Sequence, residues 1–137
     1  DGISSYIDLC QKAYGFLDNG YAAINKLLFL GADMIMVGRL FAQSVESAGE
    51  KLWEGNKLKV VYQGMSTKEN QQKYKSTTIK HSEGNCSLID VKWTIREWLN
   101  GSETEPDYLP GFINCLKSAM SYRGVNTIEQ FIGDGCY

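Results

Sequence analysis

The stretch "GADMIMVGRLFAQSVESAGE", residues 31–50, decides how this chain is expected to fold. Its apolar run at residues 34–37 is too short for a buried helix and predicts a strand over residues 33–37, enclosed on both faces. The run ends at Gly38, and a helical pattern follows at residues 40–48. A buried strand, a glycine and a helix start are how parallel α/β folds bind phosphate. The stretch therefore predicts an α/β fold, in which Gly38 is either a phosphate site or a plain turn at the end of a strand.

The composition indicates one compact domain, with 137 residues and 43% hydrophobic content. The 14 Lys and Arg side chains nearly balance 16 Asp and Glu, so no nucleic-acid partner is expected. The apolar runs fall far short of the roughly 18 residues that span a bilayer, and no signal peptide is visible, so we expect a cytoplasmic protein without a membrane partner. Four scattered cysteines and the single His81 indicate reduced thiols and no metal site.

The rest of the chain predicts helices and one hairpin. Helical periods cover residues 6–14 and 21–30, and Gly31 is a natural end for the second helix. "KLWEGNKLKVVYQG" predicts a hairpin around Glu54-Gly55-Asn56. The remaining expectations begin with a helix over residues 67–74, with Ser66 and Glu69 as its capping box, and an aperiodic loop over residues 75–87. A helix capped by Asp90 should run to Asn100-Gly101. A further helix should carry the apolar set Leu109, Phe112, Ile113, Leu116 and Met120, and a final turn is expected in "NTIEQF".

This order contains one complete parallel strand and the stub of another. Two strands cannot form a parallel sheet with its own covered core. We therefore expect the chain to be a piece of a larger fold.

Five stretches of the sequence occur in the order found in one known family. "DGI", "GADMIMVGRLFAQSVESAGE", "YQGMS", "SEGN" and "LKSAMSYRGVNTIEQF" resemble the closing third of the inosine monophosphate (IMP) dehydrogenase/guanosine monophosphate (GMP) reductase family. The resemblance covers nearly the whole chain except an insert at about residues 10–20. It implies a TIM (β/α)8 barrel, a homotetramer, and a purine mononucleotide, GMP or IMP, at the C-terminal barrel face. Residues 1–137 would be the C-terminal portion of this single barrel domain, with strands 7 and 8, the flap region and the C-terminal helices.

The resemblance assigns the phosphate and ribose contacts. In the family the amides after strand 8 hold the 5′-phosphate, and here Gly38 and Arg39 match them. The physics agrees, because a glycine lets the backbone approach and the next helix points its positive end there. Tyr62 matches a tyrosine whose hydroxyl reaches the phosphate. Asp1 matches the aspartate that accepts hydrogen bonds from the ribose, while Gly2 is an altered match, since the family has two glycines there.

The resemblance also assigns the base contacts. Gly64 and Met65 match backbone that lies against the base edge, and Ser66 lies beside them. Glu83 in "SEGN" matches the loop residue that faces the purine. A carboxylate suits guanine because N1–H and the exocyclic amine offer two parallel donors, whereas hypoxanthine offers only N1–H.

The family's nucleophilic cysteine lies after strand 6, upstream of Asp1, and none of the four cysteines matches it. A thiolate attack on C2 of the purine is what permits hydride transfer to or from a nicotinamide. We therefore expect no catalytic residue in this segment, which would be an enzyme only within a longer chain or a complex.

Two family reactions remain open. The reductase converts GMP to IMP and ammonia with NADPH, and the dehydrogenase oxidises IMP to xanthosine monophosphate with NAD. The resemblance also implies a monovalent cation as a further cofactor. The flap pair Lys73-Tyr74, the short loop after it and "GMS" favour the reductase, because the dehydrogenase pair is Arg-Tyr and lysine is no planar substitute. "YQG" and Lys68, in place of the reductase glutamate, favour the dehydrogenase. The lost glycine and the insert favour a third alternative, a non-catalytic nucleotide-binding fragment or degenerate relative.

Overall fold

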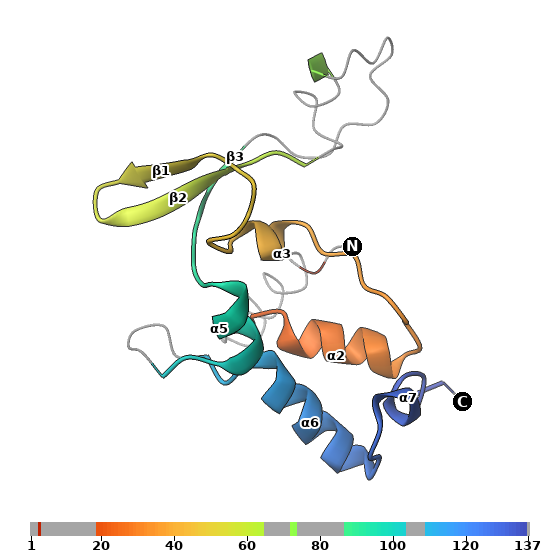
Figure 1. Cartoon of the computed structure of the whole chain (residues 1–137). Coiled ribbons are helices and arrows are strands. Elements are labelled where there is room, and N and C mark those ends of the chain that lie inside the picture. The colour runs from red at the N-terminus through yellow and green to blue at the C-terminus, as the bar shows by residue number, and fades with distance from the viewer. Residues whose placement is uncertain (1–2, 4–18, 65–71, 74–86, 104–108, 137) are drawn as a thin grey trace, which may run out of the picture.

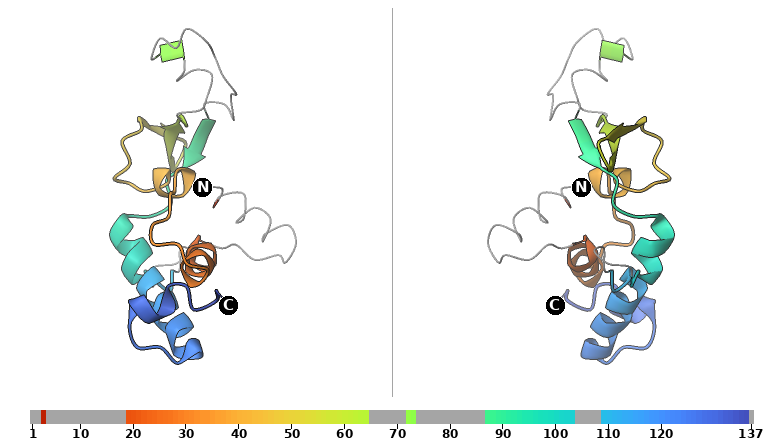
Figure 2. Two further views of the ribbon diagram at one scale, coloured as in Figure 1. Left: turned by 90° about the vertical axis from the view of Figure 1, so that its right-hand side faces the viewer. Right: turned by 90° about the vertical axis from the view of Figure 1, so that its left-hand side faces the viewer.

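The computed structural model describes residue 3 and residues 19–64, 72–73, 87–103 and 109–136. A small antiparallel sheet forms one end of the molecule and a layer of helices forms the other, with one short helix between them (Figures 1 and 2). The elements in chain order are α2 (Tyr21–Phe29), α3 (Arg39–Ala42), β1 (Lys51–Glu54), β2 (Lys57–Tyr62), β3 (Ser87–Asp90), α5 (Ile95–Asn100), α6 (Phe112–Arg123) and α7 (Ile128–Phe131). The α/β class is therefore confirmed, although the described sheet is antiparallel and its strand order is β1-β2-β3.

Helix α2 confirms the helix that was predicted over residues 21–30, and Gly31 ends it as expected. Gly31 has a φ of 108°, and its N–H donates to the carbonyl of Leu28 at 3.0 Å. The N–H of Ala32 donates to the carbonyl of Leu27, also at 3.0 Å. This is the Schellman pattern, in which a left-handed glycine lets the last carbonyls of a helix find donors.

Residues 33–37 do not form the predicted strand enclosed on both faces. Ile35 and Val37 pack partly against the core, whereas Met34 and Met36 are 92% and 73% exposed. The alternation of a strand is present, but only one face is covered. A doubly covered strand needs neighbours on both sides to satisfy its N–H and C=O groups. The described strands pair only with one another, and none of them pairs with this segment.

The predicted hairpin is confirmed, with Gly55-Asn56 as its two-residue turn between Glu54 and Lys57. A third strand, β3, was not predicted. It pairs with β2 so that Ile89 faces Val60, and both side chains are almost fully buried, at 5% and 1% exposure. The strand occupies residues that the sequence had assigned to a loop end and to a helix start.

Asp90 was expected to cap the following helix, but it is instead the last residue of β3. Helix α5 begins at Ile95, after Thr94, whose hydroxyl accepts from the N–H of Glu97 at 3.1 Å. The Glu97 carboxylate accepts in return from the N–H of Thr94, at 3.4 Å. This reciprocal capping box fixes the helix start. The predicted end at Asn100 is confirmed.

The other helical predictions are correct in type but not always in length. Helix α6 contains Phe112, Ile113, Leu116 and Met120 of the predicted helix, whereas Leu109 precedes it and pairs with Ser102 in an isolated bridge. The final turn predicted in "NTIEQF" is the four-residue helix α7. The helix expected over residues 40–48 is only the single turn α3. It stops because the chain then pairs with the segment after β3: the N–H of Val45 donates to the carbonyl of Trp93, and the N–H of Lys92 donates to that of Gln43, both at 2.9 Å. The predictions for residues 6–14, 67–71 and 75–86 lie outside the described residues.

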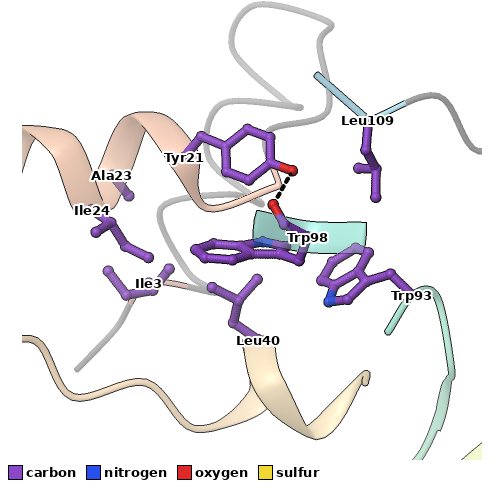
Figure 3. Packing of buried hydrophobic residues seen from close by; sticks show 8 residues of the cluster. All are labelled: Ile3, Tyr21, Ala23, Ile24, Leu40, Trp93, Trp98 and Leu109. Atoms are coloured by element: carbon purple, nitrogen blue, oxygen red, sulfur yellow. Dashed lines mark hydrogen bonds between the residues drawn. The ribbon is translucent and has the colours of Figure 1, made fainter. Parts of the chain in front are cut away.

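The core is centred on Trp98, which is 2% exposed (Figure 3). Its ring stacks on Phe112 with centroids 4.9 Å apart and meets the edge of Phe41 at 5.1 Å. The Tyr21 hydroxyl donates to the Trp98 carbonyl at 2.8 Å, and the Trp98 indole N–H donates to the carbonyl of Asn19, also at 2.8 Å. These contacts join α2, α5 and α6 to α3. The buried members of the cluster are Ile3, Tyr21, Ala23, Ile24, Leu40, Trp93, Trp98 and Leu109.

Candidate functional site

An open groove of about 630 Å³ lies between α3, the end of β2 and the loop that joins α3 to β1. Residues 38–50, residues 60–63 and Lys73 meet there. Its lining residues are Gly38, Phe41, Ala42, Ser47, Ala48, Gly49, Glu50, Val60, Val61, Tyr62, Gln63 and Lys73.

Gly38 and Tyr62, which the sequence assigned separately to one phosphate, lie against each other in this groove. Gly38 is the N-cap of α3, and Tyr62 is the last residue of β2. A Cβ atom built on Gly38 would lie 3.0 Å from the Tyr62 hydroxyl oxygen. The absence of a side chain at Gly38 therefore lets the phenol approach the start of the helix.

The start of α3 borders the groove, which is lined there by Gly38, Phe41 and Ala42. The Gly38 carbonyl accepts from Ala42 at 3.1 Å, which closes the only turn of the helix. The N–H groups of a first turn have no acceptor inside the helix. A ligand with oxygen acceptors can therefore bind to them, beside the Tyr62 hydroxyl. With a single turn, the individual amides matter more than a helix dipole.

Of the other predicted site residues, one lines the groove, two lie outside its lining, and the rest are not described. Lys73 lines the groove, so the structure brings it together with Gly38 and Tyr62. Arg39 is exposed and is not among the lining residues, and Gly64 is half-buried just beyond β2. Asp1, Gly2, Met65, Ser66, Tyr74 and Glu83 lie outside the described residues, as does Lys68.

Sequence reasoning missed one wall of the groove, residues 47–50, which we call the wall loop. A Cβ atom on Gly49 would lie 2.6 Å from both Val60 Cγ2 and the Val61 carbonyl oxygen, so only glycine fits there. The Glu50 carbonyl accepts from the N–H of Val61 at 2.9 Å. The wall loop is thereby seated on β2. The signal in the sequence was a glycine two residues before the predicted hairpin.

The floor of the groove is continuous with the core. Phe41 lines the groove and contacts the Trp98 ring, and the neighbouring Leu40 is 1% exposed. A well-packed interior holds its side chains in single positions. Packing of Leu40 and Phe41 against the core therefore fixes the start of α3, including Gly38.

The described residues contain no cluster of three His, Cys, Asp or Glu side chains suited to a metal ion. Within the same residues, none of the helices has the length and apolar character that crossing a membrane requires. Of the two described cysteines, Cys115 lies on α6 and Cys136 donates a hydrogen bond to the Leu30 carbonyl at 2.8 Å, and neither lines the groove.

The sequence matches a family model described as "IMP dehydrogenase / GMP reductase domain" over residues 17–135. It is similar to an inosine-5′-monophosphate dehydrogenase of Caenorhabditis elegans, with 25% identity over 118 residues, 85% of this chain and 22% of that protein. A GMP reductase of Streptococcus gordonii is 33% identical over 102 residues, 74% of this chain and 26% of that protein. A GMP reductase of Staphylococcus epidermidis is 29% identical over 133 residues, 92% of this chain and 36% of that protein. The chain thus spans about a third or less of the length of these curated relatives.

Proposed function

Because the chain belongs to the IMP dehydrogenase/GMP reductase family, we propose that it is the C-terminal portion of a (β/α)8 barrel in a purine nucleotide oxidoreductase. It spans 22% to 36% of the relatives named above, so the reaction would be that of a longer chain or a complex. In this proposal the groove between α3, β2 and the wall loop binds the 5′-phosphate of GMP or IMP.

The observation that carries this proposal is the approach of Tyr62 to Gly38, at 3.0 Å from a Cβ built on the glycine. A phosphate bound beside Gly38 would accept from the first amides of α3 and from the Tyr62 hydroxyl. Hydrogen bonds to a charged acceptor are roughly twice as strong as neutral ones. Arg39 is exposed next to these amides and would add positive charge at the mouth of the site.

The ribose and base contacts remain proposals from the family match. Asp1 would accept from the ribose hydroxyls, with Gly2 beside it. Gly64, Met65 and Ser66 would lie along the base edge, since Gly64 directly follows the groove residue Gln63.

We propose that Glu83 reads the purine. Its carboxylate would accept from N1–H and from the amine of guanine at once, which orients C2 for attack. In the proposed reductase reaction a thiolate from upstream of Asp1 would add to C2, and the amine, once protonated, would leave as ammonia. The carbon–sulfur bond would then break as a hydride takes the place of the sulfur at C2.

A nicotinamide cofactor, NADPH or in the alternative reaction NAD, would supply or accept the hydride at C2 when bound. The groove is open, so a cofactor could bind next to the nucleotide. Lys73 of the flap pair Lys73-Tyr74 lines the groove with an exposed side chain and would contact that cofactor. A monovalent cation does not fit this wall of the groove: the converging carbonyls of Ser47 and Gly49 already accept from the Lys51 ammonium. No step of the proposed reaction uses such a cation here.

We favour the reductase, because the Lys73-Tyr74 pair, the short loop after it and "GMS" resemble that enzyme. The test is an activity assay of the full-length protein with both substrate pairs. We expect GMP to drive oxidation of NADPH with release of ammonia, and IMP with NAD to give no turnover. Turnover of IMP with NAD alone would establish the dehydrogenase instead. Nucleotide binding without either reaction would establish the non-catalytic alternative.

We further propose that the complete protein is a cytoplasmic homotetramer, which sedimentation of the purified protein and imaging of a tagged copy would test. A monomer at micromolar concentration would contradict the homotetramer.

A further inference from the structure

We propose that Lys51 is a positioning residue for the phosphate: its ammonium clamps the wall loop, residues 47–50, in the form that completes the groove. This inference rests on the proposed function of the groove as a phosphate site. Lys51 does not itself line the groove, so it would act through the loop and not by touching the nucleotide.

The clamp consists of two hydrogen bonds from one side chain. The Lys51 ammonium donates to the carbonyl of Gly49 at 2.9 Å and also to the carbonyl of Ser47. A lysine ammonium has three donors and can therefore serve two carbonyls that converge on it. Loop carbonyls that turn inward need such donors, since an unpaired inward carbonyl is costly.

Few other described contacts hold this part of the loop. The N–H of Ser47 donates to the carbonyl of Ser44 at 3.2 Å, and the Glu50 carbonyl accepts from Val61. The hydroxyl of Ser47 is buried, and among the described residues it has no hydrogen-bond partner. The Ser47 side chain therefore does not fix the loop, and the Lys51 ammonium is the group that ties its two inner carbonyls together.

The position of Lys51 in the sheet explains why the clamp matters to the groove. Lys51 pairs with Val60 across β1 and β2, and Val60 is the residue on which Gly49 rests. The clamp thus holds Gly49 against Val60 and Val61, all three of which line the groove. If the loop opened, the groove would lose this wall.

The effect on binding follows from the fraction of molecules whose loop is closed. Apparent affinity falls in proportion to that fraction. We expect Lys51→Met to weaken GMP binding by about fivefold to thirtyfold, given that hydrogen bonds from a charged donor are among the stronger ones. Lys51→Arg keeps a charged group with several donors, so it should stay within about threefold of the wild type.

The test uses the full-length protein in four forms: wild type, Lys51→Met, Lys51→Arg and Lys57→Met. Lys57 begins β2 at the far end of the hairpin, is exposed, and lies outside the groove, so its substitution controls for the loss of one charge. Calorimetric titration gives the GMP affinity of each form. Hydrogen–deuterium exchange reports the wall loop and the Val61 amide without any ligand. For an active enzyme, KM for GMP should rise in Lys51→Met while kcat stays unchanged.

The expected result is weaker GMP binding and faster exchange in Lys51→Met alone. Unchanged GMP affinity in Lys51→Met would overturn the proposal, and so would a loss in Lys51→Arg as large as that in Lys51→Met. If the Met form folds poorly, Lys51→Arg decides alone, because a loss well beyond threefold would contradict a clamp made by a charged donor. Unchanged exchange of the wall loop would refute the clamp itself. A wild type that binds no GMP would refute the proposed function, and the positioning role with it, while the exchange data would still decide whether Lys51 holds the loop.

Discussion

Replacing Gly38 by larger residues should weaken nucleotide binding in steps that the structure sets. A Cβ atom at Gly38 would lie 3.0 Å from the Tyr62 hydroxyl oxygen, whereas ordinary contact begins near 3.4 Å. Gly38→Ala therefore requires the hydroxyl to move by a few tenths of an ångström. Gly38→Val adds two more methyl groups, which displace the hydroxyl and cover the first amides of α3.

The expected loss can be estimated from the contacts at stake. A hydrogen bond to a charged group contributes roughly 1.5–3 kcal/mol, and Gly38→Val removes at least one such bond to the phosphate. We expect a loss of about 2 kcal/mol or more, which is roughly thirtyfold in affinity. Gly38→Ala should lose no more than about fivefold, because one small shift of Tyr62 accommodates it.

The assay is titration of GMP and of guanosine into the full-length protein and its variants. Guanosine lacks the phosphate, so its affinity should hardly change. Tyr62→Phe provides a double-mutant cycle, because Gly38→Val should cost less once the hydroxyl is gone. Equal losses for GMP and guanosine would refute the reasoning, since Gly38 would then matter only for folding.

Three further predictions address the base, the helix start and the whole chain. Glu83→Gln should lower GMP affinity by tenfold to a few hundredfold and IMP affinity much less, since charged hydrogen bonds contribute ~1.5–3 kcal/mol each. Titration without nicotinamide cofactor measures both affinities, and a small equal change would mean that Glu83 does not contact the base. Thr94→Ala removes the hydroxyl that accepts from the Glu97 N–H at 3.1 Å. In urea denaturation of the full-length protein it should lower the free energy of unfolding by about 1 kcal/mol, whereas Thr94→Ser should stay near wild type. Equal losses in both variants would contradict a capping role. The isolated chain should not melt cooperatively, because Met34 and Met36 are 92% and 73% exposed and need partners, and a sharp calorimetric melt would contradict this.

The parts of the fold that were predicted correctly have local causes. Gly31 ends α2 because a left-handed glycine is needed there, and Gly55-Asn56 turns the hairpin. These signals act over a few residues and can be read from the sequence. The Thr94–Glu97 capping box is a local signal of the same kind, although the sequence analysis predicted Asp90 as the cap of this helix.

The parts that were missed depend on distant partners. Strand β3 exists because Ile89 meets Val60 on β2, a pairing that "SLID" alone does not indicate. The predicted strand over residues 33–37 has the right alternation, but no described strand is available to pair with it. Helix α3 is short because the residues after it pair with Trp93 instead.

The candidate site shows the same division. Gly38 and Tyr62 were singled out from motifs, but their approach to each other could only come from the packing of β2 beside α3. The wall loop was missed entirely, because its shape depends on the Lys51 ammonium and on the fit of Gly49 against Val60. Glu83, which was predicted to contact the purine base, lies outside the described residues, and its role stays a prediction.

The most direct test of a phosphate site at Gly38 is the affinity of the wild-type, full-length protein for GMP compared with guanosine. The two ligands differ only in the 5′-phosphate, which the account places on the first amides of α3 and the Tyr62 hydroxyl. Two or more charge-assisted hydrogen bonds should make GMP bind about a hundredfold more tightly, or more. Equal affinities for the nucleotide and the nucleoside would contradict the account.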